Sequence, residues 1–241
     1  MAQDKHNSTP LINNISSWHA VVSLGGGAAI SSDIGRSQTV PIVNPITDEF
    51  FVYTANRPTQ TGVMFDSFIG SEWAFATNWA LQMGLGYNQT GRFHASGSLL
   101  QGADMQSADL YSYHYTILTR QLLAESKLLY QLRDRYLPYL LLGLGTAFND
   151  ASNYETNVPP FLTFTRQYQN NSNQTSFSYT VGTGIDVTIA EHFRLGVGYR
   201  LADFGPIELG GATIDTTRVS GTLSQTHRYT NEILAQITWV S

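Results

Sequence analysis

Large, mostly apolar side chains occupy every second position in much of the chain, and the pattern is plainest in residues 177–202. Two alternating runs there flank a short link at 190–192. The positions between the large side chains carry small, glycine-rich or charged residues. A period of two predicts a β-strand with two different faces, and the short link makes the two strands antiparallel. This stretch is therefore predicted to be a β-hairpin with one broad apolar face.

The same alternation recurs along the chain and predicts eight strands. They cover residues 18–30, 62–76, 79–88, 109–131, 138–148, 177–189, 193–202 and 229–240. Long links at 31–60, 91–108, 149–175 and 203–225 alternate with short links at 76–78, 132–137 and 190–192. The predicted fold is an all-β, eight-stranded antiparallel up-and-down barrel, with four long loops at one end and three short turns at the other. Residues 1–17 are predicted to be a flexible lead-in, and residues 18–241 a single domain.

The predicted strand at 109–131 leaves two interpretations open. Tyr111, Tyr113 and Tyr115 share one phase of the alternation, whereas Leu122, Ala124, Leu128 and Tyr130 share the opposite phase. A β-bulge within residues 118–121 would reconcile the two phases. A short helix over residues 120–132 is the competing interpretation.

The contrast between the two faces predicts which of them points outward. Charged residues make up 13% of the chain, about half the share of a soluble domain. No run reaches the roughly 18 apolar residues of a transmembrane helix. A soluble, lipocalin-like barrel would need a charged exterior, but the second face here is crowded with glycine. Small residues suit the cramped interior of an eight-stranded barrel. The apolar face is therefore predicted to contact lipid, as in a transmembrane barrel.

The aromatic residues support this orientation. Indole and phenol rings favour the boundary between lipid and water. If the N-terminus lies on the periplasmic side, six large aromatic side chains fall at periplasmic strand ends on the apolar face. They form a predicted girdle of Trp18, Trp73, Trp79, Trp239, Tyr130 and Phe193.

Four segments resemble a known family. They are GSEWAFATNWALQMGLGY, PYLLLGLGTAFN, RLGVGYRLADFG and NEILAQITWV. They resemble the small eight-stranded outer-membrane barrels of the outer-membrane protein A and opacity-protein group, and the resemblance covers residues 18–240. It implies a location in the outer membrane of a Gram-negative bacterium, with surface-exposed loops above a membrane scaffold.

Several charged residues fall on the interior phase of the predicted strands. An isolated buried charge costs several kcal/mol, so these side chains are expected to pair across the lumen and plug it. A gated, low-conductance path is the alternative. The predicted interior charge network comprises Asp66, Glu72, Glu125, Lys127, Asp186, Arg194, Arg200 and Glu232.

Three tyrosines on alternate positions form a second candidate site near the outer mouth. Tyr111, Tyr113 and Tyr115 either stiffen an extended strand or, together with the loop at 149–175, offer an exposed contact surface.

The remaining chemistry is sparse. His94 and Ser96 form an H-x-S triplet of the kind that an outer-membrane lipid esterase uses, but His94 continues an interior phase and no acidic partner is evident. His6, His19, His114, His192 and His227 share no metal-ligand spacing, so neither a metal nor a cofactor is predicted. The net charge of −5 gives no basic footprint for nucleic acid.

The sequence therefore favours a non-enzymatic, monomeric outer-membrane barrel. Its expected partners are membrane lipid and lipopolysaccharide, and a host receptor or glycan that contacts the loops. A narrow conduit for small solutes and a lipid esterase or deacylase are the alternatives.

Overall fold

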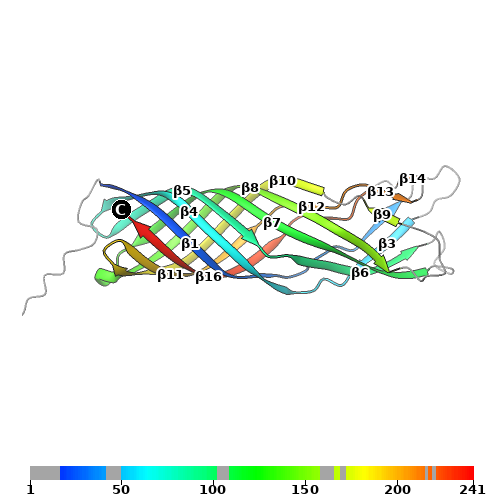
Figure 1. Cartoon of the computed structure of the whole chain (residues 1–241), viewed down its shortest axis with the longest axis horizontal. Helices are drawn as coiled ribbons and strands as arrows, with labels where there is room; N and C mark the ends of the chain where they lie inside the picture. Colours follow the sequence, from blue (N-terminus) through cyan, green and yellow to red (C-terminus); the bar gives the residue numbers. More distant parts are fainter. Residues whose placement is uncertain are drawn as a thin grey trace, which may run out of the picture.

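The computed structural model of the chain describes residues 17–41, 50–101, 109–157, 166–168, 172–214, 217–218 and 221–241. Eight of its strands form a closed antiparallel ring, and this confirms the predicted barrel. They are β1 (Trp18–Ser31), β4 (Gln60–Ala76), β5 (Trp79–Thr90), β7 (Asp109–Tyr130), β8 (Tyr136–Asn157), β10 (Ser172–Ala190), β11 (Phe193–Asp203) and β16 (Tyr229–Val240). Each pairs with the next, and β16 pairs back onto β1, with Leu24 opposite Ile237. The strands run obliquely around the long axis (Figure 1), and closure leaves the ring without an open edge.

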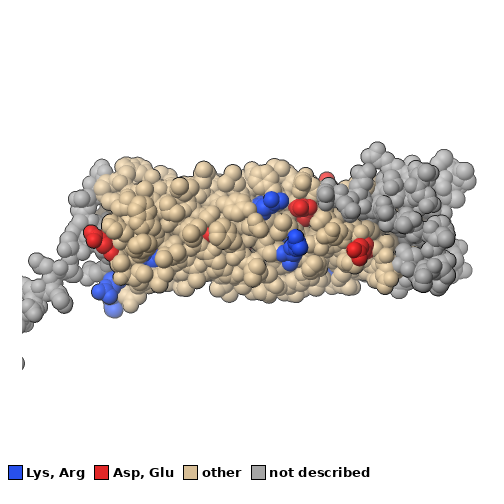
Figure 2. Space-filling view, viewed as in Figure 1, with Lys and Arg blue, Asp and Glu red and all other residues tan. Residues whose placement is uncertain are grey.

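The apolar face of the ring points outward, as predicted. Leu140 is 63% exposed and Val197 is 58% exposed, whereas Arg194, on the alternate face, is 8% exposed. On the face shown in Figure 2, almost no charged side chains appear between those at the end that holds the C-terminus and a group of charged residues near the middle of the molecule. Within the described ranges, no helix has the length and apolarity needed to cross a membrane.

The structure contradicts both interpretations of residues 109–131, the bulge within residues 118–121 and the helix over residues 120–132, because a single strand, β7, covers this stretch. Its odd-numbered side chains from Tyr111 to Leu129 are all buried, so the phase does not change within residues 118–121. The register with β5 is continuous from Arg120 to Tyr130, and the irregularity in the pairing with β8 lies between His114 and Thr116. The only helical turn in the described part of the chain is the 3-10 turn η1 (Arg133–Arg135). The apparent change of phase has another cause. The inward side chains of β7 meet an apolar core at Tyr111, Tyr113 and Tyr115, and mainly polar groups farther along the strand at Glu125 and Lys127.

Two of the predicted long links contain strands that join the main sheet. β2 (Gln38–Pro41), β3 (Phe50–Ala55) and β6 (Phe93–Gln101) extend the ring beyond its loop end in the order β2–β3–β6–β7. We give the name projecting sheet to β3, β6, the part of β7 that pairs with β6, and the part of β8 that pairs with that part of β7. The Gly/Ser-rich composition of 93–101 has a packing reason. A Cβ on Gly97 would lie 2.1 Å from the Thr54 carbonyl oxygen and 2.8 Å from a ring carbon of Tyr113, so glycine leaves room for both the neighbouring strand and the tyrosine.

The other two predicted long loops hold short strands. β12 (Ile207–Glu208) pairs with β15 (Ser224–Gln225), and β13 (Ala212–Ile214) pairs with both β9 (Arg166–Tyr168) and β14 (Thr217–Arg218). Residues 1–16 of the predicted lead-in lie outside the described residues.

Candidate functional site

The lumen of the barrel is filled by charged and polar side chains, beginning with a layer at the short-turn end. The Arg194 guanidinium forms an ion pair with Glu72, with 2.9 Å between Nη2 and Oε1, and Gln82 donates to the same carboxylate at 2.8 Å. Beside it, the Lys127 Nζ lies 2.6 Å from an oxygen of Asp186. The Lys127 ammonium also lies 3.8 Å from the centre of the Tyr139 ring. This cation–π contact stabilises the buried positive charge.

A second layer is organised around Arg200. Its Nη1 donates to Asp66 at 2.7 Å, and its Nε donates to Glu232 at 3.1 Å. Asn88 donates a further bond to Glu232 at 2.9 Å. Glu125 lies in the same region, and its Oε1 has no hydrogen-bond partner among the described residues.

All eight side chains of the predicted interior network therefore lie in the lumen and are buried. Seven of them form ion pairs with one another, and Glu125 is the one without such a pair within the described part of the chain. Burying charge is tolerable when geometry and additional hydrogen bonds compensate the loss of water. The contacts link strands far apart in the sequence, so the network braces the ring from inside.

Sequence reasoning missed one buried cation, Arg228. Its side chain is 1% exposed and lies over the Phe93 ring at 4.2 Å and the Phe204 ring at 5.8 Å. Arg228 stands two residues before Thr230, so extending the interior phase of β16 by one step would have identified it.

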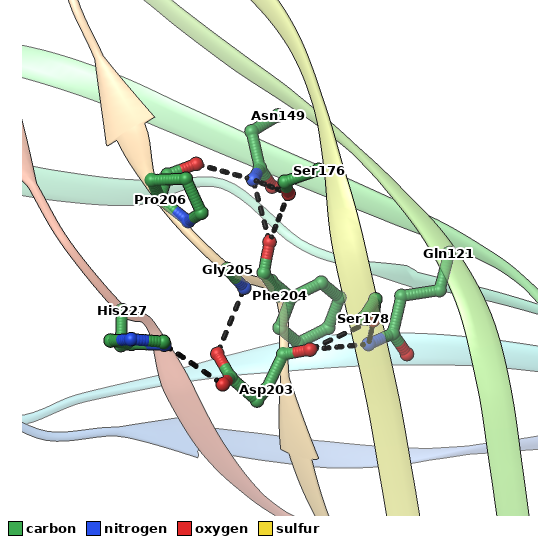
Figure 3. Close-up of polar contacts among 9 residues, drawn as sticks. All are labelled: Gln121, Asn149, Ser176, Ser178, Asp203, Phe204, Gly205, Pro206 and His227. Atoms are coloured by element: carbon green, nitrogen blue, oxygen red, sulfur yellow. Dashed lines mark hydrogen bonds and ion pairs between the residues drawn. The ribbon is translucent and has the colours of Figure 1, made fainter.

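The segment 203–206, drawn in Figure 3, begins with the last residue of β11 and brings the Phe204 ring beside the buried Arg228. Phe204 is fully buried. Its carbonyl oxygen accepts bonds from Asn149 at 2.7 Å and from Ser176 at 2.8 Å. Gly205 adopts φ +69°, a left-handed conformation that suits glycine. We call 203–206 the plug segment.

Further bonds fix both ends of the plug segment. The Asp203 carbonyl accepts from Ser178 at 2.8 Å, and the Pro206 carbonyl accepts a second bond from Asn149 at 2.8 Å. The Asp203 carboxylate accepts from the Gly205 N–H at 2.8 Å and lies 3.0 Å from His227 Nδ1. Figure 3 shows these side chains converging on the segment from the barrel wall. Backbone carbonyls turned into a closed lumen are thereby satisfied.

The structure contradicts an exposed surface formed by the three predicted tyrosines. Tyr111, Tyr113 and Tyr115 are 4%, 2% and 4% exposed. The Tyr113 ring packs edge-on against Tyr53 at 5.2 Å and stacks on Tyr154 at 6.2 Å. Because β6 and β7 extend beyond the ring in the same inward phase, these rings fill the apolar core of the projecting sheet. The side chains that this sheet exposes are the polar ones between them.

The predicted aromatic girdle lies on the outer face at the end of the barrel that holds the C-terminus. Its members are neighbours across the strands. Trp18 stacks on Trp73 with 5.8 Å between ring centres, and Trp79 packs on Tyr130 at 4.8 Å. Phe193 pairs with Trp239 in the β11–β16 register.

The H-x-S triplet lies on the outer face of β6, and this corrects the expected interior phase of His94. The phase reverses at residues 91–92, where the chain leaves the ring for the projecting sheet. The Ser96 hydroxyl accepts a bond from Asn56 at 3.3 Å, and His94 Nδ1 contacts Thr116 at 3.3 Å. Across the ladder, Ser96 faces His114. No hydrogen bond joins Ser96 to either histidine in the described ranges, so the triplet does not form a catalytic dyad.

The other described histidines have separate partners. His19 Nδ1 lies 2.6 Å from the Ser241 carbonyl oxygen and His192 Nδ1 lies 2.9 Å from the Val240 carbonyl oxygen, whereas His114 lies near Glu155 and His227 near Asp203. No group of three His, Cys, Asp or Glu residues that could hold a metal ion occurs among the described residues. His6 lies outside them.

Comparison with known proteins agrees with this geometry. A family model described as "Outer membrane protein beta-barrel domain" matches residues 51–225. A comparison with curated proteins finds no significant match. Among solved structures, the outer-membrane protease OmpT from Escherichia coli aligns with a TM-score of 0.51 and 10% identity, covering 93% of this chain and 96% of that one.

Two further solved structures align over most of the chain. The outer-membrane protein OprG from Pseudomonas aeruginosa gives a TM-score of 0.46 and 13% identity, covering 94% of this chain and 97% of that one. Ail, the attachment invasion locus protein of Yersinia pestis, gives 0.35 and 9%, covering 92% and 99%. At these identities the likeness concerns the fold alone.

Proposed function

Because this chain belongs to the outer-membrane protein β-barrel domain family, we propose that it is a non-enzymatic scaffold that presents a rigid extracellular sheet to host or envelope partners. The family and the apolar outer face of the ring place it in the bacterial outer membrane. There the girdle end faces the periplasm and the projecting sheet faces the outside of the cell.

Two features together support the proposal: buried charged side chains fill the lumen, and the extracellular sheet has a packed core beneath it. Ion pairs and the plug segment occupy the space through which a solute would pass. The projecting sheet packs on an aromatic core that includes Tyr53, Tyr113 and Tyr154 and continues into the barrel. A packed core holds the outer face of the sheet in one shape, and such preorganisation lowers the entropic cost of binding.

The exposed face of the projecting sheet favours a polar partner. Thr54, Ser98, Ser112 and Asn157 lie in one row across β3, β6, β7 and β8. Ser96, His114 and Glu155 lie in the next row. These hydroxyl, amide, imidazole and carboxylate groups donate and accept hydrogen bonds. Such an array suits the hydroxyl groups of a glycan on a host or envelope surface.

The test is a substitution in the middle of the first row. Ser98→Arg together with Ser112→Arg places two long charged side chains on the sheet, and Glu191→Arg, in a turn at the opposite end, is the matched control. We expect the refolded wild-type protein and the control to bind glycan arrays or host cells, and the double variant to lose binding. Mobility of unboiled samples on gels checks that each barrel is folded. Unchanged binding by the folded double variant would contradict the proposal.

A conduit is the second candidate, and one observation favours it. The lumen is closed in part by a loop segment, 203–206, rather than by the wall, and Glu125 adds a carboxylate without an ion-pair partner in the described part of the chain. Asn149→Ala removes the two bonds by which Asn149 holds the plug segment. A conduit predicts reproducible conductance in planar bilayers that rises in this variant. A scaffold predicts no conductance in either protein.

A further inference from the structure

A cavity of about 450 Å³ lies at the outer mouth of the barrel, between the segment that follows β1 and the segment that precedes β16. Asp33, Arg36, Arg57, Gln225 and His227 are among the residues that line it. Its volume falls within the range of sites for small ligands. It lies apart from the lumen network and from the exposed rows of the projecting sheet.

The cavity lies at the outer edge of the lipid-facing belt. Tyr229, which opens β16 and lines the cavity, is 47% exposed. On the neighbouring side, Val63 of β4 is 77% exposed and pairs with Ala28, close to the end of β1. Tyrosine rings favour the boundary between headgroups and acyl chains. The groups that line the cavity therefore lie level with the headgroups of the outer leaflet.

The walls of the cavity are held in place by contacts between the two loops. The side-chain amide of Gln225 accepts a bond from the Gly35 N–H at 3.2 Å and donates to the Asp33 carbonyl at 3.3 Å. Ile34, between them, is 1% exposed in the apolar core. Asp33 and Arg57 have φ values of 55° and 50°, unusual for residues other than glycine. Such conformations persist where the surroundings impose them, as they often do at ligand sites.

The charges on the walls favour an anion. Two guanidinium groups line the cavity against one carboxylate, Asp33. The Arg57 Nε lies 3.6 Å from Asp33 Oδ1, farther than a normal hydrogen bond. Arg36 is exposed and has no ion pair in the described part of the chain. His227 is already engaged by Asp203 and stacks on Tyr229. Guanidinium groups bind phosphate oxygens in a bidentate geometry.

We propose that this cavity binds a phosphate group of a phosphorylated glycolipid in the outer leaflet, of the lipid A type. The glycolipid would neutralise Arg36 and Arg57, while its sugar lies against the polar groups of Gln225 and Asn231. Because the cavity joins the two loops, bound glycolipid also fastens them over the mouth of the barrel. This inference depends on the outer-membrane location and not on the proposed contact with a glycan partner.

The test uses the full chain refolded in detergent micelles, with bisphosphorylated lipid A as the probe and calorimetric titration as the readout. We expect Arg36→Gln combined with Arg57→Gln to weaken binding about tenfold or more, equivalent to about 1.4 kcal/mol. Arg92→Gln is the matched control, because Arg92 is exposed between β5 and β6 and does not line the cavity. It should bind like the wild type. Arg36→Gln alone should also weaken binding, and this variant leaves the Arg57 backbone conformation untouched.

Three results would overturn the inference. The first is equal affinity in the double variant and the Arg92→Gln control, with both shown to be folded by gel mobility. The second is equal affinity of the wild type for dephosphorylated lipid A. The third is displacement of the probe by millimolar inorganic phosphate, which would assign the cavity to free phosphate instead of a glycolipid. Loss of glycan binding by the projecting sheet would leave these readouts unchanged, so the two proposals fail independently.

Discussion

Replacing Arg200 with glutamine should destabilise the barrel more than any single substitution of an exposed charge. Arg200 is 3% exposed and donates to both Asp66 and Glu232. Without the guanidinium, these two carboxylates and Glu125 lie in one layer of the lumen with no cation between them. The substitution therefore removes one partner and leaves several buried charges uncompensated.

The magnitude follows from these contacts. A hydrogen bond to a charged group contributes about 1.5–3 kcal/mol, and breaking a buried ion pair by removing one partner costs about 3–5 kcal/mol. The two bonds of Arg200 belong to the same group, so we expect a loss of about 4 kcal/mol in the free energy of unfolding. The measurement is equilibrium unfolding by guanidinium in lipid vesicles, with the folded fraction read from unboiled gel samples.

Two further variants make the measurement specific. Arg135→Gln, at an exposed position in the η1 turn, should change the free energy of unfolding little. Adding Glu232→Gln to Arg200→Gln should recover part of the loss, because one of the stranded carboxylates becomes neutral. A decrease of less than about 1 kcal/mol in the free energy of unfolding of Arg200→Gln is the scale of an exposed ion pair. That result would refute the reasoning that the lumen network is shielded from water and stabilises the ring.

Two other substitutions probe the wall of the barrel by the same unfolding measurement. Gly84→Ala should cost about 1–3 kcal/mol or prevent folding, because its Cβ would lie 2.2 Å from the Ile69 carbonyl oxygen. In Gly26→Ala the nearest atom is 3.4 Å away, so this control should be tolerated, and an equal loss in both would contradict the packing argument. Val197→Arg, in the middle of the outer belt, should cost about 2–4 kcal/mol. Thr54→Arg, on the projecting sheet, should change the free energy of unfolding little. A larger loss in Thr54→Arg than in Val197→Arg would mean that the lipid-facing belt does not include Val197.

The sequence by itself was enough to predict the ring of eight strands and the orientation of its faces. Alternation of large and small residues is a local property. In residues 177–202 it continues with little interruption, and this was sufficient to predict both strands of the hairpin. The side chains of Arg194 and Leu195 point to opposite faces because adjacent residues in a strand always do. The inward direction of six of the eight predicted charges followed from the same rule, whereas that of Glu125 and Lys127 depended on the phase of residues 109–131, which the sequence left open.

Residues 109–131 show where local pattern misleads. An inward position normally holds a small or polar residue within the membrane-spanning ring, and Glu125 and Lys127 obey this. Tyr111, Tyr113 and Tyr115 occupy the same inward phase but lie in the projecting sheet, where the interior is an apolar core. The side-chain pattern inverts while the backbone phase continues. Only the pairing of β6 with β7 shows which environment each residue meets.

The tertiary structure alone determined which side chains pair when they are far apart in the sequence. Periodicity predicts that Arg200 points inward, but the choice of Asp66 and Glu232 as its partners depends on barrel closure and strand stagger. The plug segment and the cavity between residues 33 and 229 likewise arise from loops without periodicity, positioned by Asn149 and Gln225. The direction of a side chain is set by its own strand, whereas its contacts depend on how the whole ring closes.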